Sequence, residues 1–201
     1  MDNHPESFTP EDSLRVIQTM IEKTKTTVAD NSFYFLLWGW LVFIGAVGQY
    51  ILAMIVRTDM NPIVWTIMIV GVIASPIYGL RQKKTRTVKT YVDEGLRNIW
   101  TAIGVVQTLM VFIFMRRGDW EHCYTIFILT YSIGCFLTGR LLRFAPLIRG
   151  AVFCWALAVL TTFVDVGANM LLLAAAVLGS YIIPGYLLRA EYKHQLLKET
   201  R

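Results

Sequence analysis

The chain has 201 residues, of which 55% are hydrophobic and 16% are charged, and its mean hydropathy is +0.51. A soluble domain of this length cannot bury so much apolar surface, so the composition indicates a membrane protein. The net charge of +5 does not favour nucleic-acid binding, because the basic residues lie between apolar segments that leave no room for a folded soluble module.

Residues 1–31 form a polar amino-terminal segment whose first residues lack the basic and apolar regions of a signal peptide, so we expect no cleaved signal. Thr9 is a suitable N-cap, and Pro10 suits the first helical position. Apolar residues then recur at helical spacing from Leu14 to Val28. The pattern predicts a short amphipathic cytoplasmic helix that docks either on the membrane bundle or on a partner protein.

Six charge-free apolar stretches follow, and a transmembrane helix needs about 20 such residues. They cover residues 33–56, 63–80, 99–115, 123–139, 150–164 and 170–188. The fifth stretch is the shortest, so we expect this helix to begin near Phe144 with Arg149 reaching the interface; a short or re-entrant segment is the alternative. The sequence therefore predicts an all-α six-transmembrane-helix bundle over residues 32–188, followed by a cytoplasmic tail over 189–201.

The distribution of Lys and Arg predicts the orientation, because basic residues next to membrane spans stay in the cytoplasm. Sixteen of them lie in the amino-terminal segment, the second and fourth loops and the tail, whereas the opposite side carries three. Both termini are therefore expected in the cytoplasm. The second loop, 81–97, is the most basic, and it is either a topology signal or a contact for anionic lipid. The candidate headgroup contacts are Arg81, Lys83, Lys84, Arg86 and Lys89.

Two tryptophans, Trp38 and Trp40, flank a glycine in the first stretch. At about 100° per residue they point about 200° apart, so they cannot form one aromatic pocket. Trp38 shares a helix face with Gly45 and Gln49, which suits the bundle interior. Trp40 shares a face with bulky apolar residues, which suits lipid. We therefore expect one tryptophan to point inward and the other outward.

Small residues at every fourth position mark contact faces between membrane helices. Such residues recur in the second stretch at Gly71, Ser75 and Gly79, and in the sixth between residues 175 and 180. The second and sixth helices are therefore the expected bundle interior.

Two prolines, Pro76 and Pro184, lie near the cytoplasmic ends of these same two helices, each in the pattern P-x-Y-x-L-R. A proline frees a backbone carbonyl one turn earlier and permits a kink, so both are candidate hinges. An interfacial tyrosine and an anchoring arginine explain the shared pattern, and a duplicated hairpin is the alternative.

None of the six stretches contains Asp, Glu, Lys, Arg or His, which are the usual marks of ion or proton coupling in membranes. The candidates for a polar interior are Gln49, Gln107 and Thr108, which could hydrogen-bond between helices or line a polar cavity. Asp165 is expected in a tight outer turn, with Asn169 as the N-cap of the sixth helix.

The sequence contains none of the motifs of common catalytic centres, and we expect neither enzyme activity nor a cofactor. Its three cysteines, Cys123, Cys135 and Cys154, have neither metal-ligand nor redox spacing. We therefore expect no metal site and no disulfide.

Five short motifs follow one another in the first quarter of the chain. They are Ser13-Leu14-Arg15-Val16-Ile17, Met20-Ile21, Lys23-Thr24-Lys25, Asn31-Ser32-Phe33 and Leu37-Trp38-Gly39-Trp40-Leu41. Their order resembles the opening of a family of small, uncharacterised bacterial multi-pass membrane proteins. This resemblance implies a bacterial inner (cytoplasmic) membrane and assigns no activity and no functional residue.

These features together predict a non-catalytic integral inner-membrane protein that acts through protein or lipid contacts, as a regulatory, sensory or scaffold subunit. A protein partner is expected at the amino-terminal helix or at the 81–97 loop, and membrane lipid is the expected surrounding. We expect no nucleic-acid partner, and a homo-oligomer is compatible with the pattern. The alternative is a small transporter or channel for an uncharged or lipid-like solute.

Overall fold

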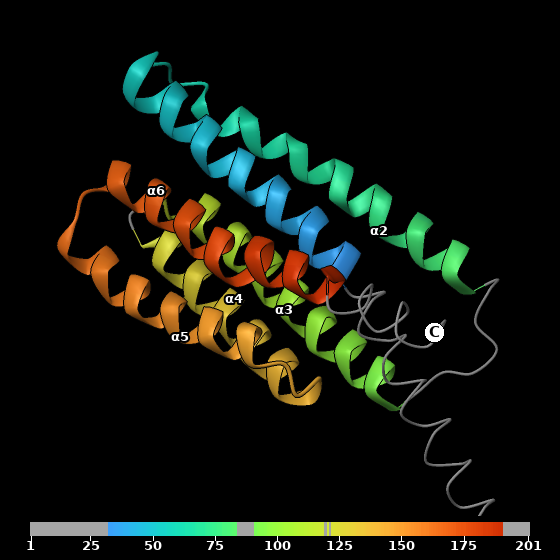
Figure 1. Ribbon diagram of the computed structural model, residues 1–201. Helices are drawn as coiled ribbons and strands as arrows, with labels where there is room; N and C mark the ends of the chain where they lie inside the picture. The colour runs from blue at the N-terminus through green and yellow to red at the C-terminus, as the bar shows by residue number, and fades with distance from the viewer. Residues whose placement is uncertain (1–31, 84–90, 119, 121, 191–201) are drawn as a thin grey trace, which may run out of the picture.

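The computed structural model describes residues 32–83, 91–118, 120 and 122–190. These residues are helical apart from short turns, and they contain no strand. Six of the helices are long and apolar enough to cross a membrane. The six spans are Ser32–Ile55, Asn61–Arg81, Glu94–Arg117, Cys123–Leu141, Ala145–Phe163 and Val166–Ala190. The predicted all-α six-helix bundle is confirmed (Figure 1), whereas the predicted amino-terminal helix and most of the tail lie outside the described residues.

The spans are built from regular helices with local changes of geometry. The α-helices are α2 (Met68–Lys83), α3 (Tyr91–Arg117), α4 (Cys123–Leu141), α5 (Ala145–Leu160) and α6 (Val166–Val177). The first span ends in a π turn, η1 (Ile51–Ile55), and α2 is preceded by a 3₁₀ segment, η2 (Asn61–Ile67). A 3₁₀ turn, η3 (Thr161–Phe163), ends the fifth span. A π turn, η4 (Leu178–Ile182), follows α6 before the helix continues over 183–190.

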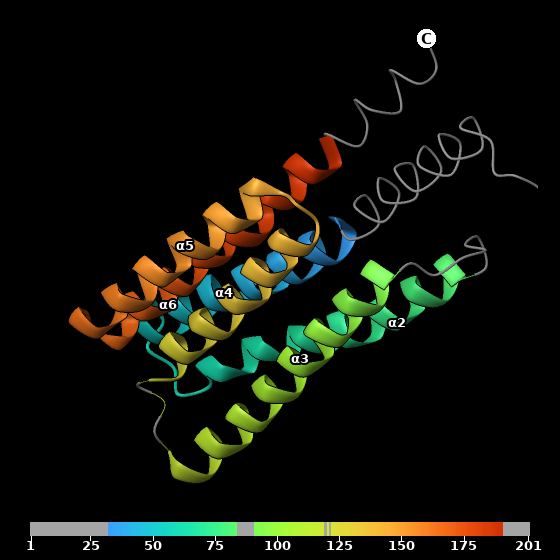
Figure 2. The ribbon, with the colours of Figure 1, turned by 90° about the horizontal axis from the view of Figure 1, so that it is seen from below.

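The antiparallel connections place the chain turns at two ends of the bundle (Figures 1 and 2). The proximal end holds residues 32 and 190 and the turn at 142–144. The distal end holds the turns at 56–60 and 164–165. This arrangement gives every helix a neighbour of opposite direction along the chain, as short loops require.

The fifth span is a complete helix. It begins at Ala145 with Phe144 as N-cap, as expected, and Pro146 occupies the first turn, where a missing N–H costs nothing. Arg149 is exposed, so its long side chain can reach the membrane interface. With η3 the span reaches Phe163, a total of 19 residues, and the re-entrant alternative does not describe it.

The start of the sixth span differs from the expectation. Asp165, rather than Asn169, is the N-cap: its carboxylate accepts a hydrogen bond from the backbone N–H of Gly167 at 3.1 Å. Asn169 lies inside the first turns of α6 and is buried. Aspartate and asparagine both cap helices well. Because Asp165 comes first in the chain and bonds to a free backbone N–H, the helix starts there and is about one turn longer than expected.

The sixth span forms the centre of the bundle, where it packs with α4, α5 and the first span. In its most apolar stretch 56% of the residues are buried, against 6% in the second span and 11% in the third. The expected interior position is therefore right for the sixth helix and wrong for the second. The small residues of α2 do make a close contact, because a Cβ on Gly71 would stand 2.7 Å from Leu41, but this contact is with the first span alone.

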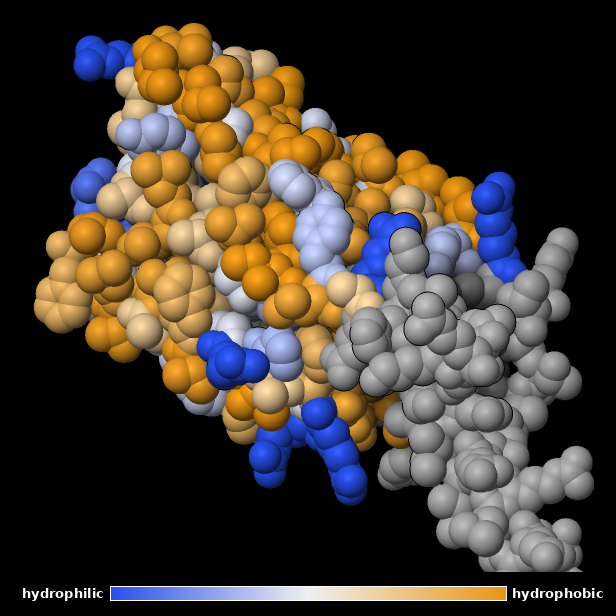
Figure 3. Space-filling view, viewed as in Figure 1, coloured by the Kyte–Doolittle hydropathy of each residue, from blue (hydrophilic) through white to orange (hydrophobic). Residues whose placement is uncertain are grey.

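The second and third spans lie at the periphery. Figure 2 shows α3 along the side of α4 that faces away from α5. Figure 3 shows a largely apolar surface over the spans, with hydrophilic side chains gathered toward its ends. The third span exposes Val105, Leu109 and Phe112, and the second exposes Ile69 and Val72. A multi-pass membrane protein with these faces contacts lipid over most of both helices.

Candidate functional site

The first polar cluster inside the bundle surrounds Gln49, near the distal end. Its side-chain oxygen accepts hydrogen bonds from Trp65 Nε1 at 2.7 Å and from the Tyr124 hydroxyl at 3.0 Å. Its side-chain nitrogen donates to Asn61 Oδ1 at 3.2 Å. Gln49 lies on the first span and its partners lie on the second and fourth, so one buried amide joins three helices. Of the two uses expected for Gln49, interhelical hydrogen bonding or the lining of a polar cavity, the structure shows the first.

The other two predicted polar residues, both on α3, do not join this cluster. The side-chain nitrogen of Gln107 is buried and has no hydrogen-bond partner among the described residues. Thr108 is exposed, and its hydroxyl donates to the carbonyl of Gly104 at 2.8 Å. The interior position expected for Thr108 is therefore incorrect. The reason is geometric: α3 buries a narrow face against α4, and Thr108 lies about 100° around the helix from Gln107.

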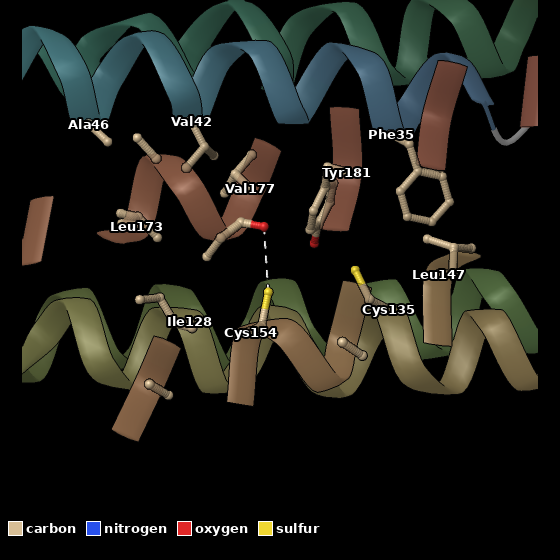
Figure 4. Close-up of a cluster of buried hydrophobic side chains, with 14 of the residues drawn as sticks. Phe35, Val42, Ala46, Ile128, Cys135, Leu147, Cys154, Leu173, Val177 and Tyr181 are labelled. Carbon is tan, nitrogen blue, oxygen red and sulfur yellow. Dashed lines mark hydrogen bonds between the residues drawn. The ribbon is translucent and has the colours of Figure 1, made fainter. Parts of the chain in front are cut away.

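The second cluster surrounds Tyr181 in η4. The rings of Phe35, Trp100 and Tyr131 lie with their centroids 5.5 to 5.8 Å from that of Tyr181, mostly in edge-to-face contact. They come from the first, third and fourth spans. Tyr181 is 3% exposed, and its hydroxyl makes no hydrogen bond to any described residue. Figure 4 shows this hydroxyl on the side of the ring that faces Cys135.

Two cysteine thiols donate hydrogen bonds to backbone carbonyls of the sixth span. Cys135 Sγ, on α4, donates to the carbonyl of Ser180 at 3.7 Å. Cys154 Sγ, on α5, donates to the carbonyl of Ala176 at 3.5 Å, shown as the dashed line in Figure 4. Both thiols are fully buried and free. The sequence does not reveal this role, because residue type and spacing within one helix do not identify the neighbouring helix that a thiol faces.

The predicted hinge at Pro184 accounts for one of these contacts. Proline has no backbone N–H, so Pro184 cannot donate the helical hydrogen bond to the carbonyl of Ser180, which lies four residues earlier. The thiol of Cys135 donates to this same carbonyl. The free carbonyl was the signal available in the sequence, and only the packing of α4 on the sixth span identifies its partner.

The second candidate hinge has different surroundings. Pro76 is exposed on α2, which continues through it, whereas Pro184 is buried. Tyr78 stacks on Phe33 with ring centroids 3.8 Å apart, whereas Tyr186 is exposed. The shared P-x-Y-x-L-R pattern thus occupies two dissimilar environments, which favours independent use at two helix ends over a duplicated hairpin.

The basic residues predicted to contact lipid headgroups are only partly described. Arg81 is exposed at the proximal end of the second span. Lys83 is the last residue of α2, and Lys84, Arg86 and Lys89 lie outside the described residues. The position of Arg81 at a helix end is compatible with the headgroup region.

The two tryptophans point in opposite directions, as predicted, but the face that Trp38 shares with Gly45 and Gln49 lies against the peripheral second span rather than in the bundle interior. Trp38 Nε1 donates to Ser75 Oγ on α2 at 3.1 Å, and Trp40 is exposed. Between them, Gly39 lies against Tyr181 and Ile182 of η4.

Both clusters hold spans together, and neither has the composition of a common catalytic centre. Among the described residues, no group of three or more His, Cys, Asp or Glu side chains is placed to hold a metal ion. Comparison with known proteins finds no matching family model, no matching curated protein and no matching solved structure.

Proposed function

We propose that this chain is a non-catalytic multi-pass protein of a bacterial inner membrane that acts through contacts, as a regulatory, sensory or scaffold subunit. The observation that carries the proposal is the contrast between the centre of the bundle and its periphery. Buried polar groups such as Gln49 and Cys135 bond to neighbouring spans. The second and third spans instead bury only 6% and 11% of the residues in their most apolar stretch.

A protein of this kind binds other membrane components at its surface, and its interior holds its own helices together. Hydrogen bonds inside the bundle are worth about 0.6 kcal/mol each in membranes, and they act here between helices. Two spans that stabilise little of the bundle are available to contact other membrane components. The basic residues support an orientation with the proximal end in the cytoplasm, where Arg81, Arg140 and Arg143 lie exposed.

The proposal is tested by site-specific photo-crosslinking in native membranes. A photoreactive amino acid at Phe112, exposed on α3, should crosslink to one discrete protein of defined size. The same residue at Leu173, which is fully buried, is the matched control and should give crosslinks only within the chain. Crosslinks to lipid alone at Phe112, at Val72 on α2 and within residues 1–31 would exclude a protein partner and leave contact with lipid.

A liposome assay separates this proposal from the alternative of a small transporter or channel. The observation that favours the alternative is that four buried side-chain polar atoms, among them Gln107 Nε2 and the Tyr181 hydroxyl, have no hydrogen-bond partner within the described residues. The contact proposal expects no solute movement by the purified protein. Reproducible flux of an uncharged solute that Gln107→Leu abolishes would overturn it.

A further inference from the structure

The turn between the fourth and fifth spans has a fixed geometry. The backbone N–H of Phe144 donates to the carbonyl of Gly139 at 2.9 Å, and that of Arg143 donates to the carbonyl of Arg140 at 3.3 Å. These two bonds form a Schellman motif, which ends α4. Leu142 and Phe144 are buried on either side of Arg143. The backbone of the turn is therefore held by its own hydrogen bonds and by the core.

Arg143 occupies the position of this motif that usually holds glycine. Its φ is +52°, in the left-handed region, where a residue with a Cβ is strained. Its side chain is exposed and makes neither an ion pair nor a hydrogen bond with a described residue, so no such contact offsets the strain. Strained residues cluster at sites that bind ligands, which makes the guanidinium of Arg143 a candidate for a contact outside the chain.

Two more arginines lie next to this turn. Arg140 is in the last turn of α4, and Arg149 lies one turn into α5. The two helices meet closely beside them, because a Cβ on Gly139 would stand 3.0 Å from the backbone nitrogen of Ile148. Arg140 and Arg149 each follow one of these contact residues in the chain. Together with Arg143 they form a basic patch at the proximal end of α4 and α5 (Figure 1).

The basic patch has no acidic partner among the described residues. All three side chains are exposed, and none forms an ion pair with a described residue. Residues 123–164 contain no Asp or Glu. Arg97 on neighbouring α3 differs, because it pairs with Glu94 at 3.6 Å. Three unpaired guanidinium groups around one turn are complementary to phosphate, which arginine binds through two parallel hydrogen bonds.

Exposed apolar side chains continue from the basic patch along the bundle. On α4, the exposed Ile133 and Leu137 precede Arg140 by seven and three residues, which places them on the same helix face. On α5, Val152 is exposed three residues after Arg149. A phospholipid fits both parts, with its headgroup at the arginines and its acyl chains along the helices, whereas a free phosphate uses only the arginines.

We propose that the basic patch binds the phosphate headgroup of an anionic phospholipid whose acyl chains lie along the exposed faces of α4 and α5. An anionic lipid is favoured over a zwitterionic one, because no described carboxylate neutralises the three arginines. The site lies on other helices than the basic loop at 81–97. It requires no protein partner, so it does not depend on the proposed function.

The test is photo-crosslinking in liposomes that contain the purified full-length protein and equal parts of phosphatidylglycerol and phosphatidylcholine with the same acyl chains. A photoreactive amino acid at Leu137 reports on lipid at the patch, and one at the exposed Val105 of α3 reports on bulk lipid. Mass spectrometry gives the ratio of phosphatidylglycerol to phosphatidylcholine adducts. We expect a ratio at least about fivefold higher at Leu137, the contribution of one arginine near a membrane surface. Equal ratios at the two positions would overturn the site.

Two double variants separate the patch from net charge. Arg140→Gln with Arg143→Gly should lower the ratio at Leu137 to the bulk value. Arg116→Gln with Arg117→Gln removes two exposed charges from the last turn of α3 and should leave the ratio unchanged. An equal fall in both variants, or no fall in the first, would contradict the proposal.

Arg143→Gly alone separates loss of binding from loss of folding. Glycine relieves the left-handed strain, so the temperature of unfolding in detergent should not fall, whereas the ratio at Leu137 should. Arg57→Gly is the matched control, because Arg57 has a φ of +55° in a turn at the distal end, and it should leave the ratio unchanged. An unchanged ratio in Arg143→Gly would show that the strained arginine does not bind the lipid, against the proposal.

Discussion

Gly39 lies against Tyr181: a Cβ built on the glycine would stand 3.0 Å from the Tyr181 Cβ and 3.0 Å from Cγ1 of Ile182. The first and sixth spans therefore meet closely at the glycine between the two tryptophans. Close backbone approach is what holds membrane helices together, because lipid is as apolar as the side chains. Trp38 and Trp40 leave this meeting point free by pointing to α2 and outward.

Gly39→Val should destabilise the bundle by about 1 to 3 kcal/mol, because the added methyl groups must displace the Tyr181 Cβ, which is attached directly to the backbone. The loss is measured as a lower temperature of unfolding in detergent. Trp40→Leu, one residue along on the exposed side, should change it little. Equal stability of Gly39→Val and the parent protein would show that the two spans do not meet here.

Gly150→Ala should be destabilising as well, because its Cβ would meet backbone atoms of η4, the Ser180 Cα at 2.8 Å and the Gly179 oxygen at 2.9 Å. Backbone cannot move aside as a flexible side chain can. The matched control is Gly104→Ala on α3, where the new Cβ meets nothing within 4 Å. That change should be neutral or stabilising by up to about 1 kcal/mol through helix propensity. The reverse order of the two variants would contradict the packing of α5 on the sixth span.

Gln49→Leu and Gln107→Leu should have opposite effects on stability. The first removes three interhelical hydrogen bonds and leaves Trp65 and Tyr124 without their acceptor, a loss of about 1 to 3 kcal/mol. The second removes a buried nitrogen that has no partner among the described residues, and it should be neutral or stabilising. The measurement is the temperature of unfolding of both purified variants. Similar decreases in this temperature would show that Gln49 and Gln107 do not differ in their contribution to stability.

The hydrogen bond between Trp38 and Ser75 should appear as a coupling energy of about 0.6 kcal/mol between the first span and α2. The measurement is a double-mutant cycle with Trp38→Phe and Ser75→Ala, read by the free energy of unfolding. Strictly additive single effects would indicate that the indole does not bond to α2. Thr108→Ala, whose hydroxyl bonds within its own helix, should show no coupling to Trp38→Phe.

Reporter fusions test the orientation that the basic residues predict. Fusions after Thr58 and after Ala168, both at the distal end, should report the non-cytoplasmic side. A fusion after Lys84 should report the cytoplasm. A cytoplasmic signal at Thr58 or Ala168 would break the six-span orientation.

Much of the fold follows from local patterns in the sequence. The six spans, the start of the fifth at Phe144 and the opposite directions of Trp38 and Trp40 are all decided by charge-free length and helical geometry within one segment. The errors concern choices between similar signals. Asp165 and Asn169 are both good N-caps, and the small residues of α2 predicted a contact face without saying how many neighbours share it.

The sequence by itself determined that this protein is a six-span membrane bundle, because the length of an apolar helix and the position of charges are properties of each segment alone. Only the tertiary structure decided that the sixth span is central and that the Cys135 thiol donates to the Ser180 carbonyl, which Pro184 leaves without an amide donor. Those facts depend on which helix faces which. In a membrane many apolar faces are equivalent, and the choice among them depends on close packing between residues far apart in the chain, such as Gly39 and Tyr181.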